Sequence, residues 1–123
     1  MARSIHDLGT LSILNGATVS SASLSGAGVV QAALGTLNVL MIFTPATLPE
    51  TVNVEVAPVT NPQAADWKRL QWQPGSDLVL GAGKAINVPL VSGFKALRIV
   101  SQAAVGGQRD FRLLAQEDSD AGA

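Results

Sequence analysis

Few residues of this chain have the type and spacing needed for catalysis. His6 is the only histidine, and there is no cysteine. A Ser-His-Asp triad would require the segment around His6 to fold over a distant serine and acid, so we interpret His6 as a solvated residue of an N-terminal arm.

The carboxylates show no metal-ligand spacing: Asp7, Glu50, Glu55, Asp66, Asp77 and Asp110. Paired-acid glycosidase chemistry would need two of them to meet, and separate exposed charges are the simpler interpretation. We expect no enzyme activity, no metal and no cofactor.

Two glycine-containing segments resemble parts of nucleotide-binding motifs. Gly81-Ala82-Gly83-Lys84 could cradle a phosphate, but a P-loop needs glycine where this chain has Leu78, and a serine or threonine where it has Ala85. The segment is typical of a hairpin turn. Gly26-Ala27-Gly28 lacks the third glycine of a dinucleotide-binding fingerprint, and no βαβ pattern surrounds it.

The segment Trp67-Lys68-Arg69-Leu70-Gln71-Trp72 interleaves aromatic and basic residues. It could stack on a sugar or on single-stranded nucleic acid. Strand alternation gives a plainer interpretation, with Leu70 and Trp72 on one face and Trp67 and Arg69 on the other. We therefore predict one tryptophan in the core and one near a rim or a subunit contact, since tryptophan and arginine are enriched at interfaces.

Charge is sparse and unevenly distributed in this chain of 123 residues, whose formal net charge is −1. The length suits one domain, and the weak charge does not favour a nucleic-acid partner. From Leu8 through Pro49 there is no Asp, Glu, Lys or Arg. The best membrane-span candidate, residues 26–43, is interrupted by polar residues and glycine, so we expect no membrane span. The N-terminus lacks the apolar core of a signal peptide. We infer that neighbouring protein covers part of the charge-free segment.

Periodicity predicts an all-β fold. Residues 51–57 alternate apolar and polar side chains with period two, as a half-buried strand does. Similar short segments follow at 70–72, 78–80, 86–90, 97–99 and 111–115, and earlier ones are expected at 10–14, within 18–34 and at 37–43. Proline and glycine turns separate them, for example Pro74-Gly75 and Gly106-Gly107. Strands at this spacing predict an antiparallel two-sheet sandwich of jelly-roll type with about eight strands.

The same patterns predict three parts. Residues 1–9 form an extended N-terminal arm, residues 10–116 form the β-sandwich domain, and residues 117–123 form a mobile acidic tail without an apolar anchor.

The order of these segments resembles that of a known group of viral proteins. The segments that carry the resemblance are 41–49 (Met-Ile-Phe-Thr-Pro-Ala-Thr-Leu-Pro), 52–56 (Val-Asn-Val-Glu-Val), 66–70 (Asp-Trp-Lys-Arg-Leu), 85–90, 93–101 and 109–114. A strand ending in a Pro-Ala turn, then a strand of alternating valines, then a tryptophan-containing strand is similar to the pattern of jelly-roll decoration, or cement, proteins of tailed-bacteriophage heads. The resemblance covers residues 10 to 116.

This resemblance implies a structural virion protein on the outer surface of the capsid, made in the host cytoplasm. Its expected partners are the major capsid protein and itself, as a homotrimer at three-fold positions that bridges capsid subunits. Isolated apolar residues in the arm and directly after it need a partner, so Ile5, Leu8, Leu11 and Ile13 are expected capsid or subunit contacts. Trp67 and Arg69 are also expected contacts, because tryptophan and arginine are enriched at interfaces. The alternatives are a carbohydrate-binding β-sandwich module and a phage tail or baseplate subunit.

Overall fold

Antiparallel strands account for most of the structure, a computed structural model that describes residues 2–20, 39–59, 61–88 and 94–119. The strands are β1 (Ala2–Ile13), β2 (Val39–Phe43), β3 (Val52–Ala57), β4 (Lys68–Arg69), β5 (Gln71–Gln73), β6 (Ser76–Asp77), β7 (Val79–Leu80), β8 (Ala85–Asn87), β9 (Ala96–Ser101) and β10 (Arg109–Ser119). One 3₁₀ turn, η1 (Ala64–Asp66), precedes β4. The all-β class predicted from periodicity is confirmed.

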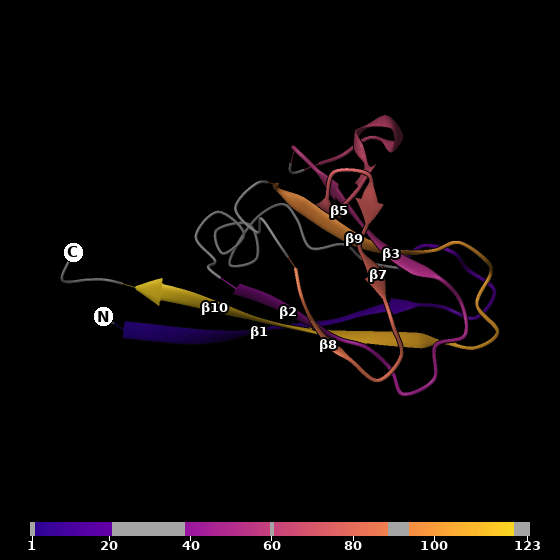
Figure 1. The fold of residues 1–123 in the computed structure, drawn as a ribbon, viewed down its shortest axis with the longest axis horizontal. Helices are drawn as coiled ribbons and strands as arrows, with labels where there is room; N and C mark the ends of the chain where they lie inside the picture. The colour runs from indigo at the N-terminus through magenta and orange to yellow at the C-terminus, as the bar shows by residue number, and fades with distance from the viewer. Residues whose placement is uncertain (1, 21–38, 60, 89–93, 120–123) are drawn as a thin grey trace.

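Two four-stranded sheets form the body of the molecule (Figure 1). The first, here called sheet A, has the order β1-β10-β2-β8. The second, sheet B, has β4-β3-β7, with β9 also paired to β3. Strands β5 and β6 form a separate two-stranded ribbon. The bridge between Val19 and Val100 joins the segment after β1 to β9, and the remainder of the predicted strand region, 21–34, lies outside the described residues.

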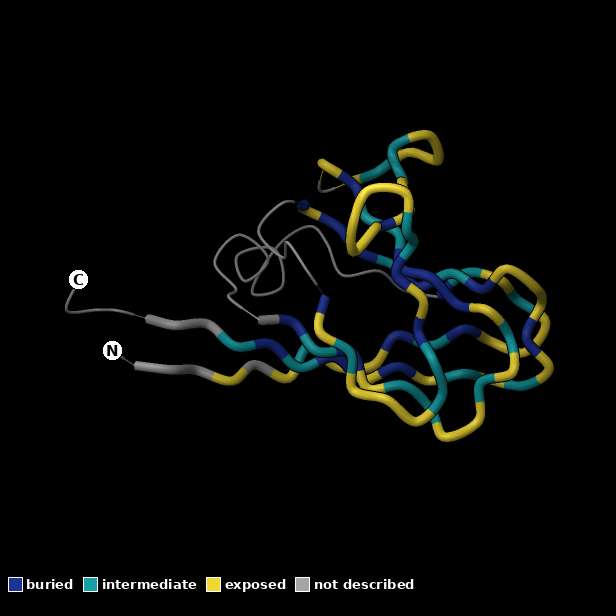
Figure 2. The backbone as a smooth tube through the Cα atoms, viewed as in Figure 1, coloured by how far each residue is buried: buried dark blue, intermediate teal, exposed yellow. Residues whose placement is uncertain are grey.

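The core lies between the inner faces of the two sheets, which gives the molecule a sandwich-like character. Alternation determines which side chains are inside: on β10, Phe111 and Leu113 are fully buried, whereas Arg112 between them is exposed. Figure 2 shows buried segments along the strands of both sheets and exposed ones in the turns. The fully buried large side chains are Ile13, Leu40, Ile42, Val52, Val54, Leu80, Val88, Leu97, Ile99, Phe111 and Leu113.

A buried polar side chain links sheet B to the segment that precedes β7. Asn53 is fully buried, and its Nδ2 donates a hydrogen bond to the carbonyl of Leu78 at 3.0 Å. Its Oδ1 accepts a hydrogen bond of 2.8 Å from Nε2 of Gln102. Because both polar atoms of the amide have partners, its burial carries no unmet desolvation cost.

The two ends of the chain lie side by side as neighbouring strands of sheet A (Figure 1). Residues 2–9, expected to be an arm, are the first part of β1, and residues 117–119, expected to belong to the tail, are the last part of β10. Residues 120–123 lie outside the described part of the chain. The paired register runs from Ala2 opposite Ser119 to Ile13 opposite Arg109.

Candidate interaction surface

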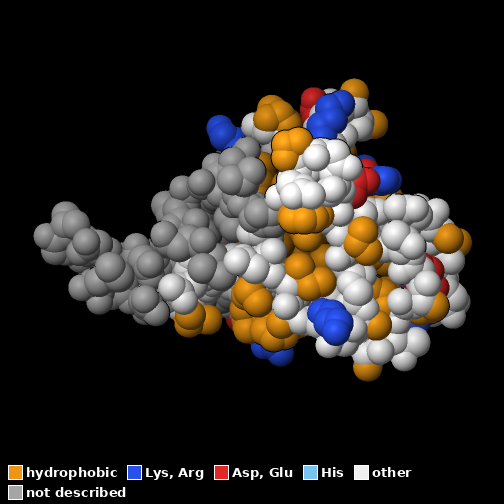
Figure 3. Space-filling model, viewed as in Figure 1, with side chains coloured by type: hydrophobic (Ala, Val, Ile, Leu, Met, Phe, Trp, Pro, Cys, Tyr) orange, Lys and Arg blue, Asp and Glu red, His pale blue; other side chains and the backbone are white. Residues whose placement is uncertain are grey.

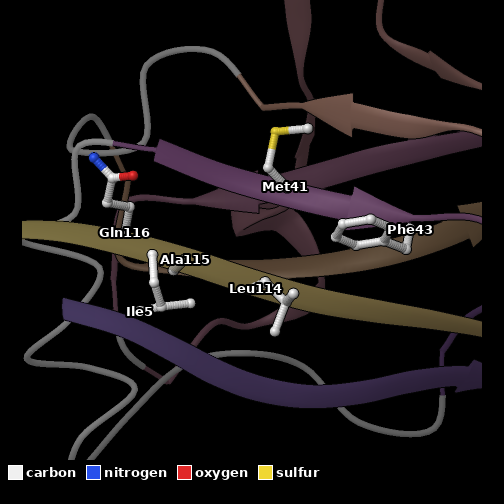
Figure 4. Close-up of a pocket in the computed structure, with 6 residues that line it drawn as sticks. All are labelled: Ile5, Met41, Phe43, Leu114, Ala115 and Gln116. Atoms are coloured by element: carbon white, nitrogen blue, oxygen red, sulfur yellow. The ribbon is translucent and has the colours of Figure 1, made fainter. Parts of the chain in front are cut away.

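The outer face of sheet A carries a cluster of apolar side chains. We call Ile5, Met41, Phe43 and Leu114 the apolar patch. They line a shallow hollow of about 200 Å³ together with Ala115 and Gln116 (Figure 4). Ile5 is 65% exposed and Phe43 is 40% exposed. Met41 and Leu114 are partly exposed beside them. Adjoining apolar side chains at the surface are one feature of protein–protein contact sites.

Strand register brings these residues together from three parts of the sequence. Ile5 of β1 lies opposite Gln116 of β10, and Leu114 of β10 lies opposite Met41 of β2. The neighbouring positions Leu40, Ile42, Leu113 and Ala115 point to the core and are buried. The alternation that fills the core with one set of side chains therefore presents the other set on the outside.

An ion pair borders the apolar patch. Nη2 of Arg112 lies 2.5 Å from Oδ2 of Asp7, and 61% and 49% of the two side chains are exposed. The N–H of Gly9 donates to Oδ1 of Asp7 at 2.9 Å. This backbone hydrogen bond and the one from Arg112 hold the pKa of the Asp7 carboxyl below its ordinary value. Asp7 therefore keeps its negative charge at neutral pH beside a positive one.

A β-bulge next to this ion pair changes the register of β1. The shift falls between Asp7 and Gly9, and Gly9 has φ of +87°. A glycine reaches this left-handed region without the penalty that a Cβ would bring. The bulge allows Ile5 and Asp7 to lie on the outer face, while Leu11 and Ile13 further along the same strand lie on the inner one.

The residues of β1 that were expected to make external contacts divide between the two faces. Ile5 is on the exposed outer face. Leu8 is half-buried and packs against the core cluster. Leu11 and Ile13 are buried members of that core. Of the four, Ile5 is the one whose side chain is largely available to another molecule.

The other two expected contact residues, Trp67 and Arg69, lie on sheet B or next to it. The Arg98 guanidinium lies 4.4 Å from the centre of the Trp67 ring, and it also contacts Glu55 at 2.6 Å. Arg69 pairs with Asp77 at 3.2 Å. The structure therefore does not bring Trp67 and Arg69 together with Ile5.

The prediction that Trp72 shares a buried face with Leu70 is wrong. Leu70 is 8% exposed, but Trp72 is 57% exposed. The alternation fails because the segment is not one strand: β4 ends at Arg69, and β5 begins at Gln71 in a different sheet. The chain changes partners at Leu70, whose N–H donates to the carbonyl of Val54.

Sequence reasoning missed the apolar patch, because it predicted a strand at 37–43 but named no contact residue within it. Met41 and Phe43 of this strand face outward. The alternation of the strand contains this information. If Leu40 and Ile42 point to the core, Met41 and Phe43 must point to the opposite face. Figure 3 shows hydrophobic side chains on the lower part of the surface, where sheet A lies in Figure 1.

Neither a metal site nor a membrane-spanning helix is found within the described ranges. Among the residues that the structure describes, no group of three or more His, Cys, Asp or Glu side chains is placed to hold a metal ion. None of the helices in that part of the chain is long and apolar enough to cross a membrane. Comparison of the chain with protein-family models and with curated protein sequences gave no match.

Proposed function

We propose that this chain is a structural virion protein that decorates and cements the capsid of a tailed bacteriophage, and that it has no enzymatic activity. The observation that carries the proposal is the apolar patch on the outer face of sheet A, in which Ile5 and Phe43 are exposed and the adjacent Met41 and Leu114 are partly exposed. A protein that stabilises a shell works by covering such surface at many repeated contacts. The all-β architecture and the segment order that resembles decoration proteins support the same role.

In this proposal the sandwich has jelly-roll topology, and three copies sit together at three-fold positions on the outer surface of the capsid. Each copy bridges neighbouring major capsid subunits through the apolar patch. The border of the patch carries both charge signs, Asp7 and Arg112, so it suits a protein surface of mixed polarity better than a uniformly charged polymer. Assembly would follow synthesis in the host cytoplasm.

Binding to empty expanded capsids of the parent phage tests the proposal. The wild-type chain is expected to co-sediment with capsids, and cryo-electron microscopy of the particles should show added density at three-fold positions. Phe43→Lys, which puts a charge into the apolar patch, should lower occupancy at least tenfold. Val79→Lys is the matched control, because Val79 is 51% exposed but belongs to β7 of sheet B. Failure of the wild-type chain to bind capsids would overturn the proposal.

Trp72 favours one second candidate, a carbohydrate-binding module. The Trp72 indole is 57% exposed at the β5–β6 ribbon, and an exposed aromatic ring can stack on a sugar. Binding on a glycan array that is lost in Trp72→Ala, together with no binding to capsids, would favour this function over cementing.

A further inference from the structure

Strand β1 is an edge of sheet A. It is the first strand in the order β1-β10-β2-β8, and Figure 4 shows β10 between it and β2. Within the described ranges, the backbone of β1 pairs with β10 alone, from Ala2 to Ile13. In an antiparallel pair, every second residue directs its N–H and C=O away from its partner strand. The outer edge of β1 therefore offers a row of donors and acceptors to another strand.

The first half of β1 lacks three of the features that commonly protect an edge strand. Edges are normally blunted by proline, lysine or a bulge, but residues 2–13 contain neither proline nor lysine. The register shift falls between Asp7 and Gly9, so the pairing from Ala2 to Asp7 is regular. Six regular residues are a typical strand length. This segment is long enough to pair with a further strand.

The first residues of β1 stay paired with β10 past the point where the pairing of β2 with β10 ends. The pairing of β2 with β10 ends at Gln116 opposite Val39, whereas β1 and β10 stay paired to Ala2 opposite Ser119. Among the described residues, 2–4 and 117–119 thus form a two-stranded ribbon. Two strands alone are marginally stable in water, so a further strand against β1 would stabilise this end of the sheet.

The sequence of the segment favours a second copy of the same chain as that further strand. In an antiparallel pair of identical strands, one residue lies opposite its own copy on a two-fold axis. If that residue is Ile5, then Arg3 of each copy lies opposite Asp7 of the other. Opposite charges in facing positions are favourable, and two isoleucines cover each other at the centre.

The neighbouring registers lack this match. Centring the pair on Ser4 places Ile5 opposite Arg3, and centring it on His6 places Ile5 opposite Asp7. Both registers put an isoleucine against a charged residue and leave the charges without opposite partners in the pair. The carboxylate of Asp7 can accept the second partner, because its side chain is 49% exposed while it contacts Arg112.

We propose that two copies of this chain pair edge to edge through the first half of β1, antiparallel, with Ile5 on the two-fold axis. The two A sheets then form one continuous eight-stranded sheet. The apolar patches of the two copies adjoin at the axis, which explains the 65% exposure of Ile5 in the single chain. This pairing needs neither a capsid nor a three-fold contact, since it joins the backbone edges of β1, although Ile5 also belongs to the patch that the proposed function uses.

A cysteine on the axis tests the register directly. The chain has no cysteine, so Ile5→Cys introduces a single thiol. Facing residues of an antiparallel pair have Cα atoms about 4.5–5.5 Å apart, within the range that a disulfide spans. Under mild oxidation at micromolar concentration, Ile5→Cys should form a covalent dimer in most molecules. Leu14→Cys is the control, because Leu14 is 48% exposed but lies after the end of β1. Equal cross-linking of the two variants would overturn the proposal.

Charge substitutions at Ile5 provide the second test, made by sedimentation velocity without capsids. Ile5→Lys and Ile5→Glu each place like charges opposite one another, and each should halve the mass of the wild-type assembly. An equimolar mixture of the two variants should recover the wild-type mass, because lysine then faces glutamate. Recovery also shows that both variants are folded. Val79→Lys should keep the wild-type mass.

The outcomes separate this proposal from the capsid role. An unchanged mass for Ile5→Lys, or a mixture that fails to recover, would overturn edge pairing whatever the capsid assay shows. Loss of capsid binding by Phe43→Lys with normal cross-linking of Ile5→Cys would leave edge pairing intact.

Discussion

Glu50 and Arg109 are 59 residues apart in the sequence and form a two-point contact. Nε and Nη2 of Arg109 donate hydrogen bonds of 3.0 and 3.1 Å to the two carboxylate oxygens of Glu50. Only 15% of the arginine side chain and 11% of the glutamate side chain are exposed. The backbone N–H of Gly106 also donates to Glu50 at 3.3 Å. The pair therefore fixes the segment before β3 to the start of β10.

Stability in acid should depend on Glu50. The hydrogen bonds from Arg109 hold the pKa of Glu50 below its ordinary value. Its contribution is therefore fully present above the pKa of the unfolded chain, near 4.5, and is lost as the pH falls through the lower folded value. Thermal unfolding from pH 7 to pH 2.5 should show Glu50→Gln less stable than wild type at pH 7, with the difference in Tm shrinking below pH 4.

The comparison with Glu50→Gln isolates this group, because Asp7, Asp77 and Asp110 also have lowered pKa values and remain in both proteins. A difference in Tm that stays constant over the whole pH range would contradict the role assigned to the Glu50–Arg109 pair.

The bulge in β1 should require glycine. Gly9 has φ of +87°, and no atom lies within 4 Å of the position that a Cβ would take. The cost of Gly9→Ala is therefore conformational, and we expect the free energy of unfolding to fall by about 1–2 kcal/mol. Gly106→Ala is the matched control, since its surroundings are also open and its φ is not in the left-handed region. Urea unfolding should show a change within about 0.5 kcal/mol for the control. Equal effects of the two substitutions would indicate that the bulge is absent.

Much of the fold follows from alternation alone. The predicted strand at 51–57 corresponds to β3, and the predicted segments at 97–99 and 111–115 lie within β9 and β10. These strands pair through most of their length, so the period of two persists and the buried face can be identified from the sequence. The order in which the strands pair does not follow from the pattern, because it depends on long-range contacts such as those between β2 and β8.

The surface features were harder to predict. The exposure of Trp72 results from a change of sheet at Leu70, which local alternation cannot reveal. The Glu50–Arg109 pair joins residues whose proximity depends on the whole topology. The pairing of residues 2–4 with 117–119 was not expected, since neither segment has the hydrophobic periodicity of a buried strand. Predicting the apolar patch requires knowledge of which strands lie beside β2, because the patch residues come from β1, β2 and β10.

Adjacent residues of β2 should respond very differently to truncation. Ile42 is fully buried in the core, whereas Met41 lies on the outer face and lines the hollow. Ile42→Ala leaves a cavity and should lower the free energy of unfolding by about 2–5 kcal/mol. Met41→Ala should lower it by less than about 1 kcal/mol. Chemical denaturation of both variants measures the contrast, and a larger loss for Met41→Ala would mean that the register of β2 is shifted by one residue.

The two tryptophans should report separately on their surroundings. Trp67 is half-buried, with the Arg98 guanidinium 4.4 Å from the centre of its ring, whereas 57% of Trp72 is exposed. In Trp67→Phe the remaining Trp72 should therefore emit at longer wavelength, and acrylamide should quench it at least twice as strongly as it quenches Trp67 in Trp72→Phe. Arg98→Ala uncovers the ring of Trp67, so in the Trp72→Phe background it should increase quenching. Stronger quenching of Trp67 than of Trp72 would contradict this prediction. It would mean that Trp72 lies on the buried face with Leu70, and that the chain does not change sheets at Leu70.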